Sequence, residues 1–239
     1  MTVEVGPVIP SLPRSVALPL LLALALPPAP DVRAAGGAHI VDDSEVEPPG
    51  TCHLETWVTR FVPGDGYLNV GPACTSERMP RIQMGATLQH YWGEDINAPL
   101  LGPTFKVNLV PEATGVGLGL DLNAGMNLRT GDLGIASLVM LVSIPLGDKV
   151  KINVNGGWSY LSNDFNQNAA FYGMQVEAKV AWDLSLMLEI FGREPGIAGA
   201  QIGLRYTPND GWVDFDILAG NSFDATSPKF FTVGVTVRF

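Results

Sequence analysis

Residues 115–128 read GVGLGLDLNAGMNL, and they place an apolar side chain at every second position. The apolar positions carry Val, Leu, Ala and Met, whereas the positions between them carry only Gly, Asp and Asn. Side chains of a β-strand point alternately to its two faces, so this period of two predicts a strand with one apolar and one polar face. Such a strand needs surroundings that are apolar on one side and polar on the other.

The same alternation recurs along most of the chain, and no segment after residue 36 shows the period of a helix. Two further strands are expected around residues 52–61 and 67–74, and a less regular one over residues 133–146, giving about twelve. The clearly alternating segments are residues 81–89, 104–109, 115–128, 149–158, 172–182, 184–190, 198–206, 213–220 and 231–239.

Two architectures use many amphipathic strands. A soluble sandwich hides the apolar faces inside, whereas a membrane barrel turns them toward lipid and lines its lumen with the polar faces. The expected strands are about ten residues long, as a tilted membrane crossing requires, and their polar faces are rich in Gly, Asn, Gln and Thr. Aromatic residues near strand ends match interfacial girdles: Trp92, Tyr160, Tyr172, Trp182, Tyr206, Trp212 and Phe239. The pattern therefore predicts an all-β fold, a closed antiparallel transmembrane β-barrel over residues 51–239.

The chain begins with the features of a secretory signal peptide. Arg14 precedes an apolar run over residues 16–26, which is too short to cross a membrane as a helix. Prolines at positions 19, 27, 28 and 30 oppose a buried helix there. We expect a signal peptide over residues 1–36, cleaved between residues 34 and 38.

Two cysteines and the acidic charge narrow the chemistry. Cys52 and Cys74 form an even pair in an exported chain, which suggests one disulfide, and the turn VPGDG at residues 62–66 would bring both to the same, periplasmic end. No Cys or His spacing suggests a metal site, and we expect no cofactor. The net charge of −10 argues against nucleic acid as a partner.

The connections agree with a barrel whose two ends lie in the periplasm. The expected outer loops are longer, with RTGD as the short exception: YWGEDINAPLLGP, YLSNDFNQNAAF, GREPGI and NSFDATSP. The expected inner turns are brief and rich in turn residues: PEATG, PLGDK, WD and TPNDG. Ends on one side require an even number of strands.

Two stretches resemble known families. The ending FFTVGVTVRF resembles the last strand of Gram-negative outer-membrane barrels, which closes on a C-terminal Phe with aromatic or apolar residues at alternate positions before it. The resemblance implies an outer-membrane location, contact with outer-membrane lipids, and a barrel-assembly machinery that reads the strand ending at Phe239.

Residues 39–61 look like the mature N-terminus of the outer-membrane barrels named for the meta-pathway of phenol degradation. They read HIVDDSEVEPPGTCHLETWVTRF. Members of that family carry a short Asp-Asp element, then a Gly and a first strand with a Glu. Asp42, Asp43, Gly50 and Glu55 match this outline, whereas the cysteine pair departs from it. The resemblance suggests passage of small molecules.

Alternation also assigns the charged side chains that face the lumen. These charges could form a constriction that selects solutes, or an internal network that merely fills a barrel of intermediate width. Both interpretations remain open at this point. The charged residues expected in the lumen are Arg81, Lys106, Asp121, Lys149, Lys151, Glu177, Lys179, Glu189, Arg205, Asp214, Asp216 and Arg238.

Residues 37–50 are expected to form an acidic periplasmic arm, in which Pro48, Pro49 and Gly50 oppose regular structure. The arm could tuck into the lumen beside Lys149, Lys151, Arg205 and Arg238 and narrow the pore, or it could be a solvated linker. Its acidic residues, the candidates for such a plug, are Asp42, Asp43, Glu45 and Glu47.

Two other functional classes compete with a channel. Some outer-membrane barrels are lipid hydrolases whose Ser and His face the bilayer, and His90 would face lipid near the outer rim. No Ser lies two residues away and no His-x-Ser occurs, so the nucleophile and base that hydrolysis needs are missing and we do not expect an enzyme. The remaining alternative is a plugged, structural barrel that displays its surface loops.

Overall fold

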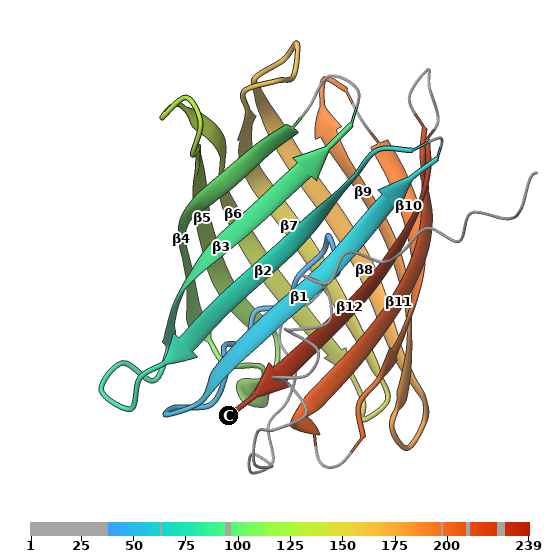
Figure 1. The fold of residues 1–239 in the computed structure, drawn as a ribbon. Coiled ribbons are helices and arrows are strands. Elements are labelled where there is room, and N and C mark those ends of the chain that lie inside the picture. Colours follow the sequence, from blue (N-terminus) through green and yellow to red (C-terminus); the bar gives the residue numbers. More distant parts are fainter. Residues whose placement is uncertain (1–37, 63, 94–96, 197, 209–210, 224–227) are drawn as a thin grey trace, which may run out of the picture.

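The computed structural model describes residues 38–62, 64–93, 97–196, 198–208, 211–223 and 228–239. Within these ranges the chain forms twelve antiparallel strands that close into one barrel (Figure 1). No helix among the described residues is long and apolar enough to cross a membrane. The expected signal peptide over residues 1–36 and its cleavage site lie outside the described residues.

The strands follow one another around the barrel in chain order, and β1 closes the ring against β12. A 3-10 turn, η1 (Glu112–Thr114), joins β4 to β5. The closed all-β architecture and the number of strands confirm the prediction from the sequence. The strands are β1 (Cys52–Phe61), β2 (Gly66–Thr75), β3 (Ile82–Trp92), β4 (Asn97–Val110), β5 (Gly117–Asn127), β6 (Leu133–Leu146), β7 (Val150–Leu161), β8 (Asn168–Ala181), β9 (Leu184–Glu194), β10 (Ala198–Tyr206), β11 (Val213–Ser222) and β12 (Lys229–Arg238).

The period of two sorts the side chains between the outside and the inside of the barrel. On β5 the apolar side chains point outward, so that Leu122 is 42% and Met126 52% exposed. In the ladder Leu122 lies between Phe105 of β4 and Leu138 of β6, which are also exposed and apolar. An apolar belt of this kind suits the hydrocarbon of a bilayer. The apolar face of the opening stretch therefore belongs to the outer surface, and its Gly, Asp and Asn face the interior.

The barrel has two distinct ends. We call the end where β1 begins and β12 ends the inner end, at the bottom of Figure 1 where the C-terminus is marked, and the opposite end the outer end. At the inner end the backbones of Cys52 and Phe239 exchange two hydrogen bonds of 2.9 Å, so the first and last strands are joined up to the last residue.

The outer connections are shorter than expected. β3 ends at Trp92 and β4 begins at Asn97, so the residues NAPLLGP belong to a strand and the prediction of a long loop there is wrong. Pro99 and Pro103 lack the N–H that a ladder uses, yet both lie within β4. The pairing of β4 with β5 passes over Gly102 and Pro103, which accommodates the missing donor.

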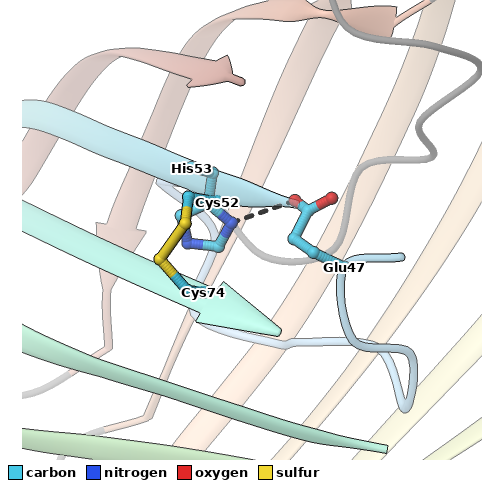
Figure 2. Close-up of a disulfide and its surroundings, with 4 residues drawn as sticks. All are labelled: Glu47, Cys52, His53 and Cys74. Carbon is cyan, nitrogen blue, oxygen red and sulfur yellow. Dashed lines mark hydrogen bonds and ion pairs between the residues drawn. A yellow bond between two sulfur atoms is a disulfide. The ribbon is translucent and has the colours of Figure 1, made fainter. Parts of the chain in front are cut away.

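Cys52 of β1 and Cys74 of β2 lie directly opposite each other in the ladder and form a disulfide, as the sequence predicts (Figure 2). Both residues lie at the inner end, because β1 starts there and β2 ends there. The bond closes a loop with a sequence separation of 22 residues.

The assignment of faces can be tested at neighbouring positions of one strand. We expect Leu122→Arg, which places a charge in the apolar belt, to lower the free energy of unfolding by about 2–4 kcal/mol. The matched control Asn123→Arg points into the barrel and should cost less. The measurement is urea unfolding of both variants in phospholipid vesicles, and equal losses would contradict the assignment.

The disulfide should stabilise the barrel by limiting the freedom of the unfolded chain. We expect the double variant Cys52→Ser and Cys74→Ser to lose about 3 kcal/mol of unfolding free energy, the entropy that closing a loop of this length removes. The same unfolding assay with and without reductant checks this. The reductant should destabilise the unsubstituted protein and leave the variant unchanged. If the reductant changes the stability of neither protein, the disulfide does not stabilise the barrel.

Candidate functional site in the barrel interior

The segment that precedes β1, residues 38–50, lies inside the barrel, and we call it the arm. Figure 1 shows its blue trace passing behind β1, within the ring of strands. Val41 is 1% exposed, and Ser44 and Glu47 are 0% exposed. The acidic segment expected in the periplasm is therefore enclosed by the barrel wall over most of its length.

Neutral side chains of the wall hold the backbone of the arm. Asn155 accepts a hydrogen bond from the N–H of Asp42 and donates one to its carbonyl oxygen, both at 2.8 Å. The hydroxyl of Ser143 accepts from the N–H of Ser44 at 2.9 Å, and Asn108 donates to the Ser44 carbonyl at 2.9 Å. An extended segment without a strand partner needs such contacts, because a buried backbone polar group without a partner is costly.

Glycines of the wall make room for the arm. A Cβ added to Gly119 would lie 3.0 Å from the carbonyl oxygen of Ser44, and one added to Gly173 would lie 2.6 Å from a methyl group of Val41. A side chain at either position would push the arm away from the wall. The inward-facing glycines of the opening stretch thus permit a second layer of chain inside the barrel.

The first charged anchor of the arm is Asp43. Its two carboxylate oxygens lie 3.3 Å from Lys106 Nζ and 2.9 Å from Lys151 Nζ, and Asp42 adds a contact of 2.8 Å to Lys106. Burial alone would raise the pKa of Asp43, but the charges of Lys151 and Lys106 outweigh it and lower this pKa to about 2. Next along the arm, Glu45 accepts a hydrogen bond of 2.6 Å from the N–H of Glu112.

The second anchor is Glu47, where the arm turns into β1. One of its carboxylate oxygens lies 2.9 Å from Nδ1 of His53 and 2.9 Å from Nε of Arg238, while Arg238 also reaches Asp214 at 2.7 Å. Figure 2 shows Glu47 and His53 facing each other beside the disulfide. Arg238, Glu47 and Asp214 are fully enclosed, so the last residues of the chain are tied to its arm.

The third anchor is His39. It contacts the carboxylate of Glu189 through Nδ1 and lies 3.4 Å from Asp216 through Nε2. Glu189 also accepts hydrogen bonds from the N–H groups of Ile40 and Val41, and Asp216 pairs with Arg205 at 2.8 Å. Burial alone would lower the pKa of His39, but its contacts with Asp216 and Glu189 outweigh burial and raise it to about 9.

Most of the charged residues expected in the lumen lie where alternation placed them. Glu177 lies 3.7 Å from Lys151, and Asp121 is opposite Lys106 in the ladder of β4 and β5. The expected lumen residues that surround the arm, directly or through one partner, are Lys106, Lys151, Glu189, Arg205, Asp214, Asp216 and Arg238.

Three of the expected lumen residues lie at the inner rim of the barrel. Arg81 and Lys149 are exposed in the turns before β3 and β7, and Lys179 is exposed near the end of β8. At the rim, a side chain on the lumen face extends into water.

The sequence pattern missed an aromatic cluster inside the outer end. Phe61, Tyr67, Tyr91, Phe191 and Phe230 form a chain of ring contacts with centroid distances of 5.1–6.4 Å. Each occupies a position in phase with inward polar residues of its strand, such as Thr59 before Phe61. That phase was the available signal that these aromatic side chains face inward. The interior is therefore polar in its inner part and aromatic at its outer end.

A cavity of about 260 Å³ remains between the arm and the wall formed by β1 to β5. Its lining includes Asp42 of the arm and, from the wall, Glu55, Trp57, Lys106 and Asp121. His39 and His53, which the sequence did not mark as functional, also reach it. This cavity is therefore lined largely by polar side chains and lies in one sector of the barrel.

Neither a metal site nor a hydrolytic site accompanies this cavity in the part of the chain that the structure describes. Within the described ranges no three His, Cys, Asp or Glu side chains are placed to hold a metal ion. His90 lies on the outward face of β3, opposite Leu68 of β2 and Pro99 of β4 in the ladder, neither of which offers a nucleophile.

The third anchor predicts a pH dependence. His39 is protonated in the folded protein up to about pH 9, whereas an unfolded His has an ordinary pKa near 6.5. Its contribution to stability is therefore complete below pH 6.5 and is lost as the pH rises through 9. We expect the difference in Tm between the unsubstituted protein and His39→Asn to shrink between pH 6 and about pH 10. A difference that stays constant or grows would contradict the anchor.

The fold is similar to that of known outer-membrane porins. The KdgM porin superposes with a TM-score of 0.63 at 6% identity, covering 78% of this chain and 99% of that chain. The NanC porin superposes with a TM-score of 0.59 at 7% identity, covering 77% of this chain and 98% of that chain. The COG4313 outer membrane channel from Pseudomonas putida F1 superposes with a TM-score of 0.60 at 12% identity, covering 82% of this chain and 98% of that chain. These likenesses concern the fold, and they confirm the closed antiparallel β-barrel predicted from the sequence.

Sequence comparison gives the family. No curated protein matches the chain. The family described as "Uncharacterised conserved protein UCP029691" matches residues 22–239, which is most of the chain. The protein therefore belongs to this family.

Proposed function

We propose that this protein is a channel of the Gram-negative outer membrane through which small polar molecules pass without energy input. The observation that carries the proposal is the polar cavity of about 260 Å³ inside a closed barrel whose outer surface is apolar. A barrel of intermediate width can enclose a water-filled path, whereas narrower barrels are filled by side chains. One structural neighbour, the KdgM porin, is known in complex with disordered oligogalacturonate, which supports solute binding by this fold.

The C-terminal strand supports the location. Phe239 ends the chain beside Cys52, and it is 48% exposed at the inner rim of the barrel. The strand FFTVGVTVRF resembles the last strand of Gram-negative outer-membrane barrels. We infer that the barrel-assembly machinery recognises this strand and that outer-membrane lipids surround the finished barrel.

The arm sets the width of the path in this proposal. Its anchors at His39, Asp43 and Glu47 hold it against the wall, so the path is left to the sector formed by β1 to β5. Opposite charges attract more strongly in a partly water-excluded interior than at an open surface. The arm is therefore a fixed constriction rather than a solvated linker.

A plugged barrel with a structural role is the alternative, since the same anchors would also hold a complete plug. The proposed channel requires passage of ions or solutes, and it requires no chemical step. Ion current through the purified protein separates the two functions.

The test is single-channel conductance in planar lipid bilayers. We expect the intact protein to conduct and a variant lacking residues 39–49 to conduct several times better, because the arm fills part of the lumen. The variant Asp148→Asn, in an exposed turn between β6 and β7, is the matched control and should behave like the intact protein. Absence of current from every form would favour the plugged barrel, and equal currents with and without residues 39–49 would show that the arm does not narrow the path.

A further inference from the structure

We propose that the path through the barrel favours cationic solutes, in particular molecules that carry an ammonium or guanidinium group. This inference rests on the proposed channel function and names the class of solute that the cavity takes. It follows from the way in which the charges around the cavity are paired.

The positively charged groups that reach the cavity already have carboxylate partners. Lys106 lies 2.8 Å from Asp42 and 3.3 Å from Asp43. His53 is 2.9 Å from Glu47, and His39 is held by Glu189 and Asp216. None of these groups is left to attract an anionic solute by itself.

Two carboxylates of the cavity wall are less well compensated. Glu55 of β1 has His53 as its nearest ion-pair partner, at 3.7 Å, and His53 is already shared with Glu47. Asp121 of β5 lies opposite Lys106 in the ladder, but within the part of the chain that the structure describes it forms no ion pair or hydrogen bond, and Lys106 pairs with Asp42 and Asp43 instead. Both side chains line the cavity. A cation in the cavity would supply the missing counter-charge.

The lining also contains a hydrogen-bond acceptor that lacks a donor. Asn123 lines the same cavity, and its buried Oδ1 accepts no hydrogen bond from the part of the chain that the structure describes. An ammonium group offers three donors and a guanidinium five, and neither offers an acceptor. Trp57 adds an aromatic ring to the lining, which can attract a cation through its face. The lining thus fits a cation in hydrogen bonding as well as in charge.

The remaining charges of the interior do not reverse this preference. Lys151 faces Asp43 at 2.9 Å and also Glu112 and Glu177, each at 3.7 Å. Arg205 and Arg238 are paired with Asp216, Asp214 and Glu47.

The cations outside the lumen have little influence on the path. Arg81, Lys149 and Lys179 lie exposed at the inner rim, where salt screens them. The fixed field along the path is therefore negative, and walls of low dielectric concentrate such a field.

The test is the permeability ratio of K⁺ to Cl⁻, obtained from the zero-current potential of planar bilayers under a KCl gradient. We expect a ratio above one for the intact protein. The double variant Glu55→Gln and Asp121→Asn should lower the ratio by about threefold or more, because it removes the two carboxyl groups of the cavity wall that attract the counter-ion. Asp148→Asn is again the matched control, and its ratio should equal that of the intact protein. Replacement of KCl by methylammonium chloride should preserve the current.

A second measurement needs no variant and covers the case in which the double variant fails to fold. The ratio of the intact protein should fall as KCl is raised from about 0.1 M to about 1 M, because the Debye length shrinks from about 10 Å to about 3 Å. A ratio at or below one at low salt, or a ratio that the double variant leaves unchanged, would overturn the inference and leave the channel function intact. No current from any form would overturn both.

Discussion

Closure of the sheet is the constraint on which the rest of the structure depends. Inside a bilayer no water can satisfy backbone N–H and C=O groups, so every strand must have a neighbour on both sides. The pairing of β1 with β12 provides this, from His53 opposite Arg238 to Phe61 opposite Phe230. Closure also divides the side chains into two sets. The apolar set faces lipid, and the polar set, including nearly all the buried charges, is collected in a small interior where each charge needs a partner.

The arm answers part of that need. Lys106, Lys151 and Arg238 point into the interior from three different strands, and each of them contacts a carboxylate of the arm. A buried cation without a partner would cost several kcal/mol. The arm and the wall are thus complementary. The wall holds Asp43 and Glu47 out of water, and these two carboxylates neutralise the positive charges of Lys106, Lys151 and Arg238.

The sequence predicts the fold well because the period of two is a local signal that the closed barrel uses directly. It also predicts the disulfide, since a turn at residues 62–66 fixes the register of Cys52 and Cys74. Alternation gives the face on which Arg81, Lys149 and Lys179 lie, whereas their exposure at the inner rim follows from where the strands begin and end. The phase within each strand gives the inward direction of the aromatic side chains, but their contacts with one another and those of His39 depend on the closed ring of strands and cannot be read from one strand.

The position of the arm also determines where specificity can reside. Neutral amides and hydroxyls, such as Asn155, Ser143 and Asn108, hold its backbone against β4, β6 and β7, and charge pairs hold its side chains. The arm therefore occupies that part of the lumen for reasons of shape as well as charge. The cavity beside the arm is bounded by β1 to β5. In the proposed channel the side chains of this sector meet the solute, and it is here that the wall carries carboxylates that the arm and the other strands compensate less than the rest.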